Sequence, residues 1–223
     1  ELSAVCRPAR EVGGDFFTEL PCAAKDGHAI AWGDVSGKSI SAALMMMAAH
    51  EVLNALALAH PEPEELLRLA NERLYRLRGR GDRLHGGSFV ALGWLGFEPG
   101  GGRLRYTLAG QPPPLLRRAM SVEELAMPPH RVPLGAFSFG GHQVLETAMA
   151  PGDLLLAYSD GVVEAQSPAG EAFGELRLRA AFGAGPAEPR AMLEHLVGEL
   201  EAFSRGHTPY DDVTLVVARR SPG

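Results

Sequence analysis

The stretch Gly33-Asp34-Val35-Ser36-Gly37-Lys38 decides how this sequence is interpreted. It follows an apolar run, residues 29–32, and precedes a long segment rich in Ala, Leu and Met that begins near Ser39. Glycines let the backbone turn sharply and bring carbonyl oxygens close to an ion that a neighbouring carboxylate also reaches. We therefore predict a metal-binding turn at Asp34, between a strand and a helix.

A nucleotide-binding P-loop is excluded at this turn. That motif needs a glycine, four further residues and then Gly-Lys-Ser or Gly-Lys-Thr. Gly37, Lys38 and Ser39 match its second half, but Trp32 stands where the first glycine is required. Gly33 is too close, because it leaves only three residues before Gly37.

Composition limits the classes of protein to consider. The chain has 223 residues, is 46% hydrophobic and carries a formal net charge of −6. This hydrophobic content is enough for a sizeable core, and the acidic balance argues against nucleic-acid binding, which usually needs a basic face. We expect one domain over residues 1–223, and the abrupt start suggests the catalytic module of a longer protein.

Cysteine usage and apolar segments bear on the compartment. The only cysteines are Cys6 and Cys22, without CxxC spacing, so a reduced, cytoplasmic protein is expected, although a disulfide stays open. The first residues lack the basic head and apolar stretch of a signal peptide. Residues 42–59 are the most apolar, but polar groups interrupt them, which predicts a buried helix and no membrane span.

Hydrophobic periodicity and turn signals predict the elements. Strands are predicted over residues 2–7, 28–32, 88–97, 103–109, 115–118, 143–149, 154–158 and 213–218, helices over 39–59, 64–77, 173–182 and 189–203, and an irregular stretch over 120–141. Asp26-Gly27 is a strong hairpin turn. It would set Asp15 and Asp34 on neighbouring strands of one hairpin.

Four aspartates, Asp15, Asp34, Asp160 and Asp211, each lie at the end of a predicted strand, and glycines flank three of them. Clustered carboxylates repel one another unless cations hold them, and oxygen ligands select Mg²⁺ or Mn²⁺ over zinc. Two such ions about 3.5–4 Å apart can activate a bridging water for in-line displacement at phosphorus. For any single one of these residues, capping a turn is the simpler interpretation.

Five segments resemble, in order, the motifs of the SpoIIE/RsbU group of PP2C-type phosphatases. They are Glu11-Val12-Gly13-Gly14-Asp15-Phe16, the turn at Asp34, residues 109–116, residues 156–161 and Asp211-Asp212-Val213-Thr214. The resemblance implies an α+β fold, an α-β-β-α sandwich of two mostly antiparallel sheets flanked by helices, with a site for two Mn²⁺ or Mg²⁺ ions at one edge. It also implies hydrolysis of phosphoserine or phosphothreonine on a protein, commonly an anti-sigma-factor antagonist of the STAS type.

The resemblance further implies roles for single residues. Asp34 resembles the carboxylate that bridges both metals, and Asp160 and Asp211 would complete the first metal's protein ligands. Asp15 would face the second metal, partly through water, together with the carbonyl of Val35. These four aspartates are the predicted catalytic residues.

The sequence departs from the family pattern at two positions. Ser39 replaces the last glycine of the usual Ser-Gly-Lys-Gly turn, and Gln111 stands where the family has a histidine. Gln111 can donate a hydrogen bond but cannot act as an acid near neutral pH. A catalytic role of that histidine would therefore be lost here, whereas a structural role would survive.

Three side chains near these motifs have weaker assignments. Arg10 and Lys38 could bind the substrate phosphate, Arg10 in bidentate fashion, although a solvated side chain is the simpler interpretation of each. Asp212 is expected to bond the turn backbone and not a metal.

The leading hypothesis is a metal-dependent protein serine/threonine phosphatase. The alternatives are a catalytically silent phosphatase fold that binds a phosphoprotein and, more remotely, a two-metal phosphodiesterase. No Cys-x5-Arg signature follows either cysteine, which disfavours a cysteine nucleophile. Residues 39–77 are predicted to form a regulatory and homodimer-forming surface on which an upstream sensory segment acts.

Overall fold

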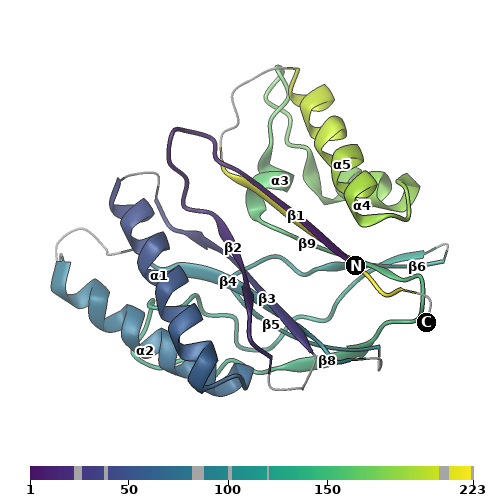
Figure 1. Ribbon diagram of the computed structural model, residues 1–223. Coiled ribbons are helices and arrows are strands. Elements are labelled where there is room, and N and C mark those ends of the chain that lie inside the picture. The colour runs from purple at the N-terminus through teal and green to yellow at the C-terminus, as the bar shows by residue number, and fades with distance from the viewer. Residues whose placement is uncertain are drawn as a thin grey trace. The chain divides into compact units, whose positions relative to one another are not determined.

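The computed structural model describes residues 1–22, 27–37, 40–81, 88–99, 102–119, 121–205 and 211–221. Within these residues the chain forms two five-stranded sheets and five helices (Figure 1). Every ladder between the named strands is antiparallel. The predicted α+β fold with two antiparallel sheets and flanking helices is confirmed.

The chain divides into two compact units, each built on one sheet. Unit 1 comprises Glu1–Glu11, Pro112–Leu125 and Met149–Gly223, and unit 2 comprises Val12–Gln111 and Ala126–Ala148. The units interleave along the sequence, so neither is one continuous segment. The single domain over residues 1–223 stays a prediction.

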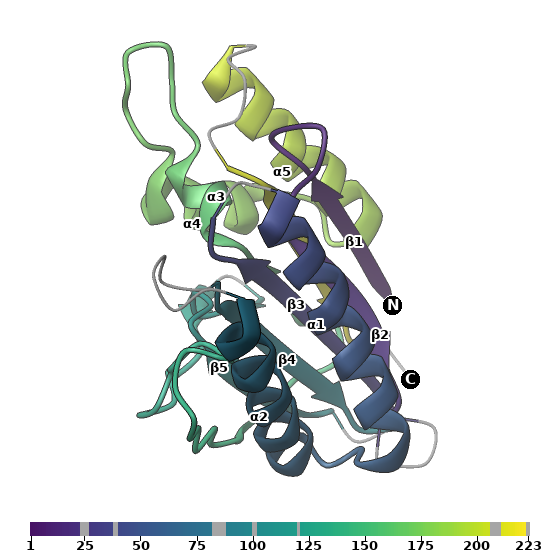
Figure 2. The same ribbon diagram turned by 90° about the vertical axis from the view of Figure 1, so that its left-hand side faces the viewer.

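Unit 2 has the strand order β2-β3-β4-β5-β8, and α1 and α2 lie beside each other over one face of this sheet (Figure 2). Apolar side chains fill the space between them, among them Leu53 of α1, Leu66 of α2 and Leu92 of β4. The elements are β2 Phe16–Leu20, β3 His28–Val35, α1 Ile40–Ala59, α2 Pro63–Gly81, β4 Val90–Phe97, β5 Arg103–Ala109 and β8 Leu145–Ala148.

Helix α1 is long and apolar enough to cross a membrane by length and composition, criteria that core helices also meet. It contacts β2, β3 and α2. Its buried face consists largely of small side chains, which allow close approach to the sheet: Ala42, Ala49, Leu53, Leu56 and Ala57. In this structure α1 is therefore a helix packed on a sheet.

Unit 1 has the strand order β1-β10-β9-β6-β7, with α5 against β1 and β10 and α4 against α5, β6 and β7. The elements are β1 Leu2–Arg7, β6 Leu115–Arg118, β7 Ser121–Glu124, β9 Leu154–Tyr158, α3 Asp160–Glu164, α4 Gly174–Ala184, α5 Pro189–Ser204 and β10 Val213–Arg219. Helix α5 begins at a good cap, because the Glu188 carboxylate accepts from the N–H groups of Arg190 and Ala191 and a proline follows it.

Several element bounds differ by a few residues from those that the sequence predicts, among them β3, which extends to Val35, and three differences are larger. Strand β7 lies in the stretch expected to be irregular, because its exposed residues show no hydrophobic alternation and its register comes from pairing with β6. Helix α2 continues past Leu77 to Gly81, and Arg78 bonds the carbonyls of Gly135 and Ala136 near its end. The short helix α3 was not predicted, since five residues are too few for a periodic signal.

Candidate active site

Asp15 and Asp34 come together at one end of the β2–β3 hairpin in unit 2. Phe16 pairs with Gly33, and the Val35 N–H donates to the Gly14 carbonyl at 3.3 Å. This register sets Asp15 opposite Asp34, with Asp15 buried and Asp34 half-buried. Like charges directly opposite each other on neighbouring strands are destabilising, so this arrangement favours a bound cation.

Gly14 leaves space beside two of the predicted ligand atoms. A Cβ at this position would lie 2.9 Å from the carbonyl oxygen of Val35 and 3.3 Å from Oδ1 of Asp34. Any larger residue would therefore crowd both oxygens. The glycine keeps open a cradle that an oxygen-coordinated ion fits.

Ser36 fixes the turn after Asp34, a role that the sequence interpretation missed. Its N–H donates to the Phe89 carbonyl at 3.0 Å, and its Oγ accepts from the Phe89 N–H at 3.0 Å. Gly37 then takes a positive φ of 101°, which favours glycine. Lys38 and Ser39, the next residues, lie outside the part of the chain that the structure describes.

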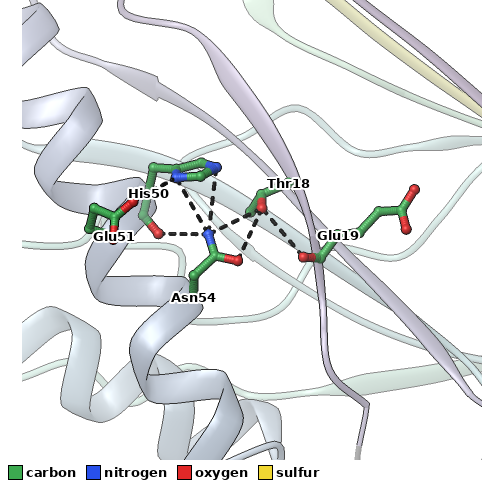
Figure 3. A network of polar contacts seen from close by, with 5 residues as sticks. All are labelled: Thr18, Glu19, His50, Glu51 and Asn54. Atoms are coloured by element: carbon green, nitrogen blue, oxygen red, sulfur yellow. Dashed lines mark hydrogen bonds and ion pairs between the residues drawn. The ribbon is translucent and has the colours of Figure 1, made fainter.

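A polar network ties β2 to α1 (Figure 3). Asn54 Nδ2 donates to Thr18 Oγ1 at 3.2 Å and to the His50 carbonyl at 2.9 Å. The His50 ring also meets the Phe16 ring edge-on, with 6.2 Å between centroids. These contacts hold the strand that carries Phe16, the residue directly after Asp15, against the helix that follows the Asp34 turn.

Asp160 and Asp211 come together in unit 1, where the end of β9 meets the start of β10. Ser159, which is 1% exposed, joins the two segments: its Oγ accepts from the Thr214 N–H at 3.0 Å, and its N–H donates to the Thr214 carbonyl at 3.0 Å. Asp160 is exposed at the first position of α3 and Asp211 is half-buried. Ser159 was not singled out in the sequence, although it directly precedes Asp160.

Gly161 permits this approach. A Cβ there would lie 2.0 Å from the Asp212 carbonyl oxygen and 3.2 Å from the Cβ of Asp211. Asp212 itself is buried, and its Oδ1 accepts from the Ala9 N–H at 2.7 Å. Its carboxylate thus bonds main chain as expected, although its partner lies beyond the turn.

The other predicted contacts have different outcomes. Arg10 is exposed in the irregular segment after β1, and its assignment to phosphate stays a prediction. Gln111 is buried and its Nε2 donates to the Ala91 carbonyl at 3.1 Å. Position 111 therefore holds a structural hydrogen bond in this chain.

Each unit thus supplies one pair of aspartates with oxygen donors and a glycine that clears space beside them. Among the residues described in either unit, no three His, Cys, Asp or Glu side chains are grouped to hold an ion by themselves. An all-oxygen donor set of this kind fits Mg²⁺ or Mn²⁺. A common two-metal site for all four aspartates stays a prediction.

Comparison with known proteins identifies the family. The model of the family Stage II sporulation protein E (SpoIIE) matches residues 24–221. Protein IcfG of Synechocystis sp. is 25% identical over 99% of this chain, which spans 38% of the length of IcfG.

Solved structures have the same fold. The SiaA-PP2C domain of Pseudomonas aeruginosa matches with a TM-score of 0.82 and 22% identity, covering 98% of this chain and 85% of that domain. The RsbU and RsbW domains of Rv1364c from Mycobacterium tuberculosis match with a TM-score of 0.78 and 27% identity, covering all of this chain and 60% of that one. RsbX in complex with magnesium matches with a TM-score of 0.67 and 14% identity, covering 99% and 94%. Because the family model covers most of the chain and the fold agrees, the chain belongs to the SpoIIE family of PP2C-type serine/threonine phosphatase domains.

Proposed function

We propose that this domain hydrolyses phosphoserine or phosphothreonine on a regulatory protein with the help of two Mn²⁺ or Mg²⁺ ions. The observation that carries the proposal is the pair of aspartates in each unit, beside a glycine that leaves space for them, in a chain whose residues 24–221 match the SpoIIE family model. RsbX, which has the same fold, binds magnesium.

In this proposal Asp34, Asp160 and Asp211 would hold one ion. Asp34 and Asp15, the latter partly through water, would hold the other together with the Val35 carbonyl. When bound, the ions supply an activated water and stabilise the charge of an in-line displacement at phosphorus. The chain's own contribution is to hold the carboxylates in place through the β2–β3 register, Gly14 and Gly161.

In the same proposal, cationic side chains bind the substrate phosphate. Arg10 is exposed, so its guanidinium is available to bind a phosphate in bidentate fashion. Lys38 is proposed as a second cation from its place in the motif alone. Replacing either by Met should raise KM for a phosphopeptide more than it lowers kcat.

The first experiment is p-nitrophenyl phosphate hydrolysis with Mn²⁺, Mg²⁺ or a chelator, using the wild type, Asp34→Asn and Asp160→Asn. We expect metal-dependent turnover that both substitutions abolish. Asp153→Asn is the matched control, because Asp153 is a buried carboxylate at the opposite end of β9 that bonds the Ala150 N–H. Turnover that persists in Asp34→Asn would reject the assigned site.

A catalytically silent module that binds a phosphoprotein is the alternative, and retention of all four aspartates does not favour it. Calorimetric Mn²⁺ titration separates the two, since a degenerate site should not bind the ion tightly. Hydrolysis of bis-p-nitrophenyl phosphate in preference to the monoester would instead indicate a phosphodiesterase.

The proposed substrate is a phosphorylated anti-sigma-factor antagonist of the STAS type. The solved relative Rv1364c carries its RsbU domain in one polypeptide with an RsbW domain, which supports a place in partner-switching regulation. A phosphorylated STAS-domain protein should be dephosphorylated with a higher kcat/KM than a phosphoserine peptide of the same local sequence. Equal values would argue against recognition of a folded partner.

We further propose that residues 39–77 form a regulatory and dimer-forming surface. Helix α1 carries large apolar side chains on its exposed side, Ile40, Leu44, Met47 and Leu58, which are 79%, 63%, 61% and 77% exposed. Such a stripe is typical of a helix that packs on another protein surface. Leu44→Glu should shift a dimer to monomer in sedimentation velocity, whereas Leu176→Glu, at an even more exposed leucine on α4, should not.

Control by an upstream segment is part of the same proposal. The natural protein with and without its upstream segment should differ in turnover, and the difference should disappear in the Leu44→Glu variant. Identical rates with and without that segment would count against the proposal.

A further inference from the structure

Gln111 makes a contact that nothing in the proposed chemistry uses. It lies two residues beyond β5, is 4% exposed, and its Nε2 donates to the carbonyl oxygen of Ala91 at 3.1 Å. Its Oε1 is buried without a hydrogen-bond partner among the described residues. Buried polar groups are normally bonded, so a buried amide held through its donor alone calls for an explanation.

Ala91 is the residue of β4 that pairs with Asp34 of β3. Two residues closer to the turn, the Ser36 N–H donates to the Phe89 carbonyl. Antiparallel pairs alternate between hydrogen-bonded and non-hydrogen-bonded kinds, so Asp34 and Ala91, two residues along, belong to the hydrogen-bonded kind. The Gln111 amide therefore bonds the main-chain group that ties β4 to Asp34.

Gly110 lets the chain after β5 pack closely against Ala91. Its φ is +100°, and a Cβ there would lie 3.2 Å from the Cβ of Ala91 and 2.9 Å from Cγ of Pro133. Side chains alternate across a strand, and Ala31 and Val35 of β3 belong to the core under α1 and α2. Asp34 and Ala91 thus share the opposite face of the sheet, on which Gly110 also packs.

We propose that Gln111 is a positioning residue for Asp34, which it holds through the Ala91 carbonyl, and that it transfers no proton. The catalytic consequence rests on the proposed function, whereas the positioning itself does not. A neutral histidine offers the same two groups, one N–H donor and one acceptor nitrogen. Gln111 and the histidine of the family motif can therefore fill the same structural role.

The test compares Gln111→Met, which keeps the bulk but removes the donor, with Gln111→His and with Tyr106→Phe. Tyr106→Phe is the matched control, because Tyr106 is buried in the same unit and its hydroxyl donates to another main-chain carbonyl, that of Ala126, at 2.9 Å. The measurements are amide hydrogen exchange over residues 33–36 and 89–92, calorimetric Mn²⁺ affinity, and the pH profiles of kcat and KM for p-nitrophenyl phosphate.

We expect Gln111→Met to speed exchange over these segments and to weaken Mn²⁺ binding by about 5- to 30-fold, the factor that one lost buried interaction produces. Tyr106→Phe should leave both values at the wild-type level. Gln111→His should restore both and add no ionisation to the kcat profile. If Gln111→Met does not fold, Gln111→Asn, whose amide is one methylene too short, should give the same changes.

Wild-type exchange and Mn²⁺ affinity in Gln111→Met, or equal changes in Tyr106→Phe, would overturn the proposal. A new ionisation in Gln111→His that raises kcat would overturn it too, because it would identify the position as an acid–base site. Hydrogen exchange needs neither metal nor substrate. A wild type without Mn²⁺ binding or turnover would therefore refute the proposed function, while exchange would still decide the positioning role.

Discussion

Gly161 and Gly14 position carboxylates by leaving space. Each lies beside predicted ligand residues of its own unit, where a Cβ would meet main-chain oxygen at 2.0 Å for Gly161 and 2.9 Å for Gly14. Main-chain atoms cannot swing aside as the end of a flexible side chain can. A methyl group at either position must therefore displace the strand ends that carry the aspartates.

Gly161→Ala is expected to lower phosphatase turnover by about 100-fold, the effect of displacing catalytic groups by about 1 Å. The measurement is kcat with p-nitrophenyl phosphate and Mn²⁺. Gly198→Ala is the control, since Gly198 lies in α5 with nothing within 4 Å of a built Cβ. That control should keep full activity, and equal losses in both variants would contradict the steric explanation.

Arg117 is a second residue whose contribution to stability depends on its buried contacts. Its guanidinium is buried, bonds the carbonyls of Phe182, Gly185 and Pro186 at 2.8, 2.7 and 2.9 Å, and lies over the Phe182 ring. Burial lowers the pKa of Arg117. The side chain thus satisfies carbonyls in the last turn of α4 and just beyond it, where the last helical carbonyls have no partner within the helix.

Arg117→Met should lower the free energy of unfolding by about 2–5 kcal/mol, because several buried carbonyls lose their donor. Urea unfolding followed by circular dichroism measures this loss. Arg190→Met removes an exposed ion pair with Glu194 and should have a much smaller effect. A loss of similar size in the two variants would show that the buried bonds of Arg117 add little to the free energy of unfolding.

At the scale of elements, the segment before β8 is fastened to α2 by side chains. Asn71 donates to the Phe137 carbonyl at 3.2 Å and accepts from the Gly135 N–H at 2.9 Å. Near the end of this segment lies His142, which is 7% exposed. Its Nε2 contacts the Val132 carbonyl at 3.0 Å. The other ring nitrogen, Nδ1, is buried without a partner among the described residues, so protonation of the ring would place a charge in a buried site.

Burial accordingly lowers the pKa of His142 from its ordinary value of 6.5. The unfolded chain then binds this proton more readily than the folded chain. His142 contributes stability that is complete above the unfolded pKa and is lost as the pH falls below it. Between about pH 7.5 and about pH 5.5, the wild type should therefore lose more stability than His142→Gln, by at most about 1.4 kcal/mol per pH unit. Tm values across this range test the prediction, and parallel pH curves would contradict it.

For the whole molecule, the acidic balance and the proposed ions are linked. The net charge is −6, and four of the carboxylates are proposed to be metal ligands. An ion that binds only the folded chain stabilises it by mass action. Metal removal should therefore act on the stability of the protein as well as on its turnover.

Mn²⁺ at 100 times its Kd should raise the stability by about 2.7 kcal/mol and the Tm by about 5–10 °C for a chain of this size. Differential scanning calorimetry with Mn²⁺ and then with excess chelator measures the shift. Asp34→Asn should lose this response and Asp153→Asn should keep it. A shift of the same size in Asp34→Asn would place the stabilising ion elsewhere.

Local signals in the sequence account for most of the elements. Strands β1, β5, β6 and β9 have the predicted bounds, because their apolar runs end at glycine, proline, serine or charged residues. The predicted turn lies between a strand and a long helix, but it begins after Asp34, because β3 extends to Val35 and includes Asp34 in its pairing with β4. Strand β7 was missed because its pairing with β6 and not its own pattern makes it a strand.

The sequence by itself determined the order of most strands and helices, the family, and the four strand-end aspartates, since periodicity and turn residues act over a few positions. Only the tertiary structure decided that β1 pairs with β10, that Gly161 faces the Asp212 carbonyl, and that Gln111 bonds Ala91 opposite Asp34. The physical reason is that these contacts join segments far apart in the chain. They form because folding buries apolar surface and satisfies the polar main-chain groups buried with it, which no short window of sequence specifies.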